Sequence, residues 1–85
     1  MDRRISEMRN LGPVMERRLR EIGVESERDL CELGSIAAWH RLRFVFGQEI
    51  SLTALHAIEA ALLDCDWRHL APEVKARLTA EAVHP

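Results

Sequence analysis

The residues best suited to bind a ligand lie near the N-terminus, in the stretch MRNLGPVMERRLREIGVES at positions 8–26. An Asn-Leu-Gly-Pro sequence forms a corner there, and a helix is expected to follow it. The backbone N–H groups of such a corner and of the helix start can hold a phosphate without reading bases. Arginines on both sides of the corner add positive charge. The candidate nucleic-acid-binding residues are therefore Arg9, Asn10, Gly12, Arg17 and Arg18.

The corner itself has the outline of a helix-hairpin-helix turn. A short leading helix, which Ser6 can cap, is expected before it. Asn10 can take the left-handed conformation nearly as well as glycine, Leu11 can plug the crevice between the helices, and Gly12 permits close backbone passage. A β-branched side chain at Gly12 is thus expected to cost about 1–3 kcal/mol of stability.

The charge pattern also allows an interpretation without nucleic acid. Residues 1–20 contain six arginines and three acidic residues, whereas residues 21–34 contain five acidic residues and one arginine. The net charge of the chain is −2, far from the strongly basic balance of a protein whose whole surface binds DNA. The arginines can instead keep a helix face solvated, or pair with the acidic segment of a second copy.

Catalysis has little support, because a nucleophile needs an oriented base and a metal needs several converging ligands. His56 and Glu59 are three residues apart and can share one side of a helix, but a pair is not a metal site. The other histidines are scattered, at positions 40, 69 and 84. Trp39 and Trp67 are expected in the core rather than stacked on bases. We expect no catalytic residue, no metal and no cofactor.

The two cysteines, Cys31 and Cys65, have neither CxxC nor metal-ligand spacing. Each is expected to be a small buried or half-buried hydrophobic residue. No apolar stretch is long enough for a signal peptide or a membrane span. A cytoplasmic location without membrane contact is therefore the default expectation.

Helical spacing of apolar residues runs through the chain, and no alternating strand pattern appears. Met15, Leu19 and Ile22 predict a helix over about 13–22. The segment SLTALHAIEAALLDC is the most apolar and predicts the central helix. The residues expected to start or stop the helices are, in chain order, Pro13, Gly23, Ser26, Gly34, Ser35, Gly47, Ser51 and Pro72, with the three serines as side-chain caps.

Several side chains are expected to face the core. They are Ala38, Leu42 and Val45 in the helix after Ser35, Trp67 and Leu70 in a tight turn, and Val74, Leu78 and Ala82 in the last helix. A chain of 85 residues has too little core to divide between two units. The prediction is one all-α domain over residues 1–85, a compact bundle of about five or six short helices with a helix-hairpin-helix-like N-terminal corner.

Taken together, RNLGPVMERRLREIGVESERDLCELGSIAAWHRLR and ISLTALHAIEAALLDCDWRHLAPEVKARL resemble the C-terminal domain of TfoX (Sxy), the bacterial regulator of competence for DNA uptake. The resemblance covers residues 9–78. It implies a helical domain of helix-hairpin-helix character, related in outline to the C-terminal domain of the RNA polymerase α subunit. In the family another domain precedes this one, so the chain is expected to be a stand-alone version.

The resemblance implies a non-catalytic module of transcription regulation. If Arg9, Arg17 and Arg18 face a phosphate backbone together with the corner amides, association with DNA is expected to be weak and without sequence preference. One residue departs from the phosphate-binding hairpin: Val14 follows Gly-Pro, where a lysine is common. The alternative is a protein interaction module that docks on a transcription component or on itself. A homodimer is expected, because Trp39, Phe44, Val45 and Phe46 are too many large apolar side chains for one small protomer to bury.

Overall fold

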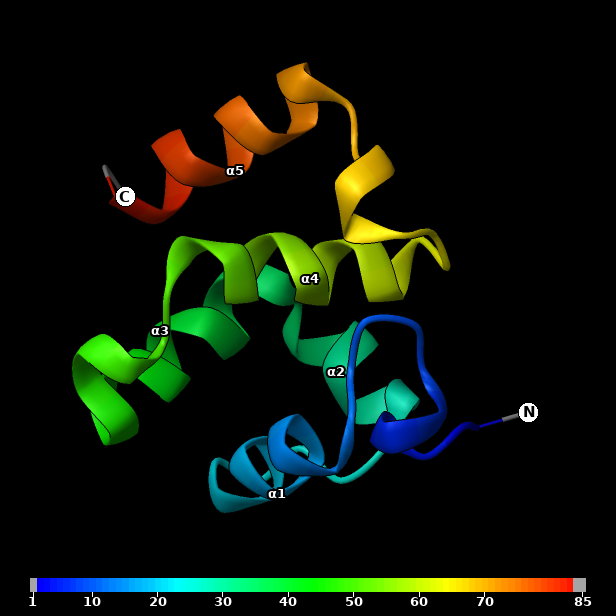
Figure 1. Cartoon of the computed structure of the whole chain (residues 1–85). Helices are drawn as coiled ribbons and strands as arrows, with labels where there is room; N and C mark the ends of the chain where they lie inside the picture. The colour runs from blue at the N-terminus through cyan, green and yellow to red at the C-terminus, as the bar shows by residue number, and fades with distance from the viewer. Residues whose placement is uncertain (1, 84–85) are drawn as a thin grey trace.

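The computed structural model describes residues 2–83, which form five α-helices and three single 3₁₀ turns (Figure 1). In chain order these are η1 (Ile5–Glu7), α1 (Pro13–Glu21), α2 (Glu27–Leu33), α3 (Ser35–Phe46), η2 (Gly47–Glu49), α4 (Leu52–Leu62), η3 (Trp67–His69) and α5 (Pro72–Val83). Within residues 2–83 the β-type pairing is limited to one antiparallel bridge between Arg4 and Ser26. The predicted all-α class is confirmed. No described helix is both long and apolar enough to cross a membrane.

Helix α4 lies at the centre of the molecule, with α5 on one side and α1 to α3 on the other (Figure 1). Its buried side chains are Leu55, Ala57, Ile58, Ala60 and Ala61. The three alanines allow neighbouring helices to approach closely, as ridges of one helix pack into the grooves of the next. The prediction of a central helix in this segment is confirmed.

The buried side chains form one cluster to which every α-helix contributes. Its largest fully buried members are Ile5, Leu19, Leu30, Leu42, Ile50, Leu55, Ile58 and Leu78. Each stabilises the fold by about 1.5–3 kcal/mol relative to an exposed position. Leu70 is also buried and Trp67 packs half-buried against the cluster, so the segment after α4 folds back on the core as predicted.

Two helices end in the same hydrogen-bonded motif. After α1, the N–H of Val24 donates to the Leu19 carbonyl at 2.9 Å and the N–H of Gly23 to that of Arg20 at 3.0 Å. Gly23 has φ +89°, the left-handed value that this C-cap requires. Asp64 takes the same role after α4, with φ +55°. The predicted stop at Gly23 is confirmed.

The predicted serine caps are correct only in part. Ser26 caps α2, with its hydroxyl 3.5 Å from the N–H of Asp29. Ser51 precedes α4, but its side chain makes no cap bond. Ser35 is the first residue of α3 and Gly34 is the N-cap, so the buried Ser35 hydroxyl makes no cap bond and donates to Glu59 at 2.7 Å. Ser6 lies inside η1 rather than before it.

The buried stripe of α3 differs from the prediction at one position. Ala38, Trp39 and Leu42 are buried, but Val45 is 53% exposed. Trp39 takes the remaining inward place because its indole N–H donates to the Ser51 carbonyl at 2.9 Å. In the last helix Leu78 and Ala82 are buried and Val74 is half-buried, as predicted.

Candidate functional site

The corner before α1 is closed on the chain itself. Asn10 has φ +69°, which confirms the predicted left-handed conformation. Its side-chain Nδ2 donates to the Cys65 carbonyl at 2.8 Å, and its Oδ1 accepts the backbone N–H of Trp67 at 3.2 Å. The Asn10 amide therefore ties the corner to the segment between α4 and η3 and is not turned toward a ligand.

Gly12 does not have the role that the sequence suggested. Its backbone is extended, with φ −124° and ψ −169°, a conformation that any residue adopts. A Cβ atom added at Gly12 meets no atom within 4 Å. The expected close passage, and with it the expected penalty for a larger side chain, is wrong. Leu11 is 5% exposed, so the predicted plug is confirmed.

Three of the six arginines in residues 1–20 are paired with carboxylates. Arg3 contacts Glu27 at 2.8 Å and Asp64 at 3.5 Å. Glu16 lies 3.6 Å from Arg4 and 3.8 Å from Arg20, and it accepts the N–H of Ser6 at 3.0 Å. The Ser6 N–H is the main cause that lowers the pKa of Glu16, and the Arg3 side chain is the main cause that lowers the pKa of Glu27. Arg3 and Arg4 therefore hold the N-terminal segment on the helices, whereas Arg20 pairs within α1.

The other three, Arg9, Arg17 and Arg18, form no ion pair within 4.0 Å with any described residue. Arg9 and Arg17 are exposed. Arg18 is half-buried, and its guanidinium lies 5.5 Å from the centre of the Phe46 ring. Helix α1 thus brings two of the candidate arginines together. No local sequence signal pointed to the contact of Arg18 with Phe46, because it joins separate helices.

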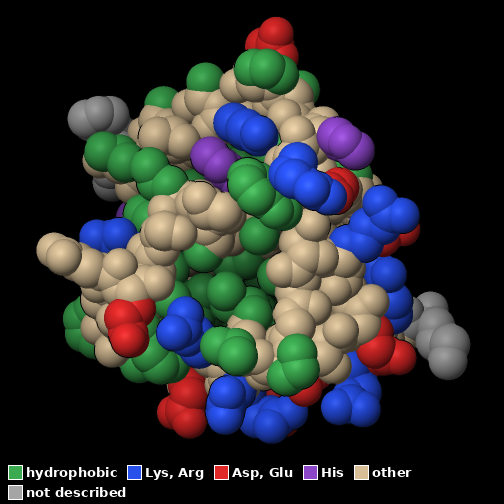
Figure 2. All heavy atoms as spheres, in the orientation of Figure 1, with side chains coloured by type: hydrophobic (Ala, Val, Ile, Leu, Met, Phe, Trp, Pro, Cys, Tyr) green, Lys and Arg blue, Asp and Glu red, His purple; other side chains and the backbone are tan. Residues whose placement is uncertain are grey.

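Val14, Arg17, Arg18, Glu21 and Phe46 line a surface groove of about 300 Å³, which we name the α1–α3 groove. Val14 is 53% exposed and lies one turn before Arg18 on the same side of α1. Figure 2 shows hydrophobic and Lys or Arg side chains close together at the lower edge of the molecule, where α1 lies. The groove combines apolar walls with two arginines that have no carboxylate within 4.0 Å among residues 2–83, and Glu21 lies at its edge.

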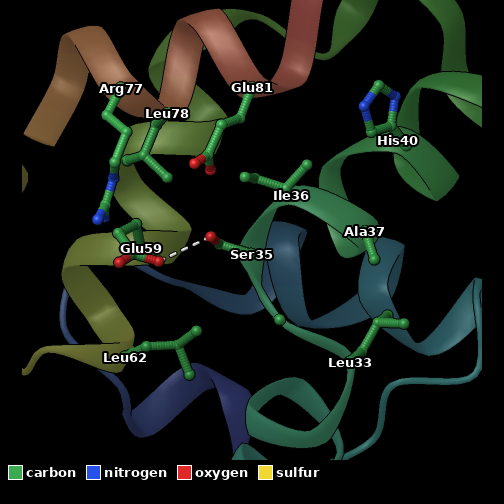
Figure 3. Close-up of a pocket in the computed structure, with 11 residues that line it drawn as sticks. Leu33, Ser35, Ile36, Ala37, His40, Glu59, Leu62, Arg77, Leu78 and Glu81 are labelled. Atoms are coloured by element: carbon green, nitrogen blue, oxygen red, sulfur yellow. Dashed lines mark hydrogen bonds between the residues drawn. The ribbon is translucent and has the colours of Figure 1, made fainter. Parts of the chain in front are cut away.

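A second groove, of about 680 Å³, lies between the start of α3, α4 and α5 (Figure 3). Arg77 and Glu81 project toward it from α5, above the hydrogen-bonded pair of Ser35 and Glu59. Leu62 and Leu78 contribute apolar lining. The Ser35 hydroxyl is buried and donates to Glu59, so this hydrogen bond joins α3 to α4 beneath the groove.

His56 and Glu59 do not act as a pair. The Nε2 atom of His56 lies 3.3 Å from the Thr79 hydroxyl, whereas Glu59 accepts from Ser35. Burial is the main cause that lowers the pKa of His56, and the charge of Lys75 adds to it. Residues 2–83 contain no group of three or more His, Cys, Asp or Glu side chains placed to hold a metal ion.

The cysteines differ in exposure. Cys65 is half-buried, as predicted, but Cys31 is exposed, and that prediction is wrong. Leu30 is buried and Leu33 half-buried on the inner side of α2, so the neighbouring Cys31 points away from the core. Both cysteines are free thiols.

Four helices around the central α4, with a tight corner before α1 and the two surface grooves described above, define a small all-α domain. The chain belongs to the TfoX C-terminal domain family, whose model matches residues 1–82. The resemblance seen in the sequence is thereby confirmed.

Two solved structures are similar to the chain, both of proteins from Listeria monocytogenes. A triclinic crystal form of an uncharacterized protein has a TM-score of 0.87 at 26% identity, with 93% of this chain and 89% of that chain covered. A tetragonal form of a protein of unknown function has a TM-score of 0.85 at 26% identity, covering 93% and 95%. No curated protein matches the chain.

Proposed function

We propose that this protein is a non-catalytic regulatory module that acts in transcription regulation by docking on another protein. Membership of the TfoX C-terminal domain family supports the regulatory role, of which control of competence genes is the family example. The α1–α3 groove is the observation that carries the docking role. Val14 is half-exposed and Arg18 covers the Phe46 ring. These apolar groups favour contact with a partner protein, because their burial against it is stabilising. The proposed location is the cytoplasm.

Weak association with duplex DNA is the second candidate function. Arg9 and Arg17 have no carboxylate partner among the described residues, and the first N–H groups of α1 precede its first intrahelical bond, from Glu16 to Gly12. Three features oppose it: the net charge of −2, the inward-turned Asn10 amide and the apolar side chain of Val14. Docking on a protein is therefore the better-supported function.

Capture from an extract of the native cells, with and without nuclease, tests the proposed function. The variants Val14→Asp and Val83→Asp form a matched pair, because the two valines are 53% and 51% exposed and lie on different helices. We expect a partner that nuclease leaves bound, that Val14→Asp loses and that Val83→Asp keeps. Equal capture by both variants would contradict docking through the α1–α3 groove.

Duplex retardation over a range of salt concentrations tests the second candidate. If Arg9, Arg17 and Arg18 contact phosphates, log K falls with log[salt] with a slope of about −3, at about 0.9 per phosphate. Replacing Arg17 and Arg18 by alanine then reduces the slope by about two. The protein-docking function instead predicts no retardation even at low salt.

A further inference from the structure

We propose that the α1–α3 groove binds an acidic amphipathic helix of the partner protein, with apolar side chains between Val14 and Phe46 and carboxylates on Arg17 and Arg18. This rests on the proposed function, which assigns protein docking to the groove. It adds the chemistry of the segment that is bound.

The apolar part of the argument comes from the two walls of the groove. Val14 stands on α1 with half of its side chain exposed, and Phe46 stands half-buried at the end of α3. An α-helix presents apolar side chains every three or four residues on one face, which is how grooves of this kind are filled. Helix α1 has nine residues, about 13 Å, and so matches two to three turns of a partner helix.

The charge part of the argument comes from the two arginines. Neither Arg17 nor Arg18 has a carboxylate within 4.0 Å among residues 2–83, so both remain available to an acidic ligand. Arg18 is held over the Phe46 ring at 5.5 Å. Because the stacked guanidinium is already ordered, it loses less conformational freedom when it pairs with a carboxylate.

Glu21 sets the direction of the bound helix. It lines the groove one turn after Arg17, so a ligand carboxylate near it is repelled. The N-terminal end of α1, with its free N–H groups, favours negative charge. The acidic side chains of the ligand therefore lie at Arg17 and Arg18, beside the apolar side chains that contact Val14, and its less acidic end lies toward Glu21. A nucleic acid gains nothing from the Val14 and Phe46 walls and meets the same repulsion at Glu21.

Nuclear magnetic resonance titration of the whole ¹⁵N-labelled chain tests the proposal. The probe is a synthetic 16-residue peptide with leucine and phenylalanine at helical spacing and glutamate between them. A scrambled peptide of the same composition, in which the spacing is broken, separates amphipathic docking from simple charge attraction. The expected result is shifts at Val14, Arg17, Arg18 and Phe46, with binding at least about five-fold tighter for the periodic peptide.

Variants locate the binding energy. We expect Arg18→Ala to weaken binding about five-fold and Val14→Asp about ten-fold. Arg28→Ala and Val83→Asp replace the same residue types at exposed positions of α2 and α5, and they are expected to change it less than two-fold.

Three outcomes would overturn the proposal. The scrambled peptide could bind as tightly as the periodic one, the shifts could be confined to the second groove between α3, α4 and α5, or duplex DNA could bind more tightly than the peptide at the same residues. If the peptide fails but Val14→Asp still loses the captured partner, the groove docks a protein of different chemistry. If capture is the same for both valine variants while the peptide binds, the proposed function fails and the peptide site remains.

Discussion

The N-terminal segment, residues 2–12, and the α1–α3 groove both carry arginines, but they use them differently. In the segment, Arg3 and Arg4 pair with Glu27 and Glu16, and the Asn10 amide is bonded to the 65–67 segment. In the groove, Arg17 and Arg18 have no such partner among the described residues. The polar groups of the corner therefore stabilise the fold, whereas those one turn later remain free for a ligand. A corner with the sequence of a phosphate-binding hairpin can thus serve mainly to attach the N-terminal segment to the rest of the fold.

Acidification is expected to have the largest effect on the N-terminal segment. The pKa values of Glu16 and Glu27 are lowered in the folded protein, the first chiefly by the Ser6 N–H and the second chiefly by the Arg3 side chain. A lowered folded-state pKa means that the unfolded state binds more protons. The stability from these groups is therefore complete above their ordinary value of 4.5 and is lost as pH falls below it.

Urea unfolding at several pH values measures this effect. The midpoint is expected to fall first between about pH 7 and pH 5, because the lowered pKa of His56 lets the unfolded state bind more protons there, and to fall further below about pH 4.5. Glu16→Gln is expected to reduce the fall, because it removes one of the carboxylates. A midpoint that stays constant down to about pH 3 would show that the N-terminal pairs do not stabilise the fold.

The next largest effect is expected at Asn10. Asn10→Ala loses two hydrogen bonds and places an alanine at positive φ, so we expect a loss of about 2 kcal/mol. Asn10→Gly keeps the backbone conformation and should lose about half of that. Arg9→Ala, next to it, should change stability by less than about 0.5 kcal/mol, as measured by urea unfolding. Equal urea midpoints for Asn10→Ala and Arg9→Ala would mean that the Asn10 side chain does not stabilise the fold.

Two glycines provide a smaller and matched test. Gly23 has φ +89°, so Gly23→Ala should cost about 1–2 kcal/mol. Gly12 is extended with open space around its Cα, so Gly12→Ala should change stability by less than about 0.5 kcal/mol. Thermal unfolding of both variants decides the point. A larger loss of stability for Gly12→Ala than for Gly23→Ala would indicate that the backbone at Gly12 is closely packed, as the sequence suggested.

The smallest effect on stability is expected at Phe44, which is 92% exposed. Self-association remains a prediction. Trp39 is buried, which leaves Phe44, Val45 and the half-buried Phe46 as its apolar contacts. Light scattering at tens of micromolar protein should give a dimer mass for the wild type and for Leu63→Asp, and a monomer mass for Phe44→Asp. Leu63 is the control because it is 57% exposed elsewhere, on the turn after α4. A monomer mass for the wild type would contradict the predicted homodimer.

The sequence predicted what depends on local physics. Helical spacing located the helices, Gly23 marked the end of α1, and the tolerance of asparagine for positive φ identified the conformation of Asn10. Val14 lies outside the helical spacing of Met15 and Leu19, a signal for its exposure that the sequence contains but that the prediction did not use. Each of these features depends on residues within about one or two helical turns.

The partners of the side chains could not be predicted, because they are fixed by tertiary packing. Ser35 looked like a cap but donates to Glu59, which is 24 positions away. Arg18 looked like a phosphate contact but lies against Phe46. Whether a polar side chain is free or occupied is the property that decides a binding site, and it appears only when the helices are in place.

The two hydrogen bonds of Asn10 span 55 and 57 positions along the chain. Closing a loop of that length costs chain entropy before any contact repays it, so such bonds form late in folding. The corner around Asn10 is therefore expected to be among the last segments of the domain to take its native place. Substitutions at Asn10 should accelerate unfolding and leave the refolding rate almost unchanged, which stopped-flow kinetics can measure. The corner is therefore expected to dock on the fold after α4 and the segment that follows it have formed.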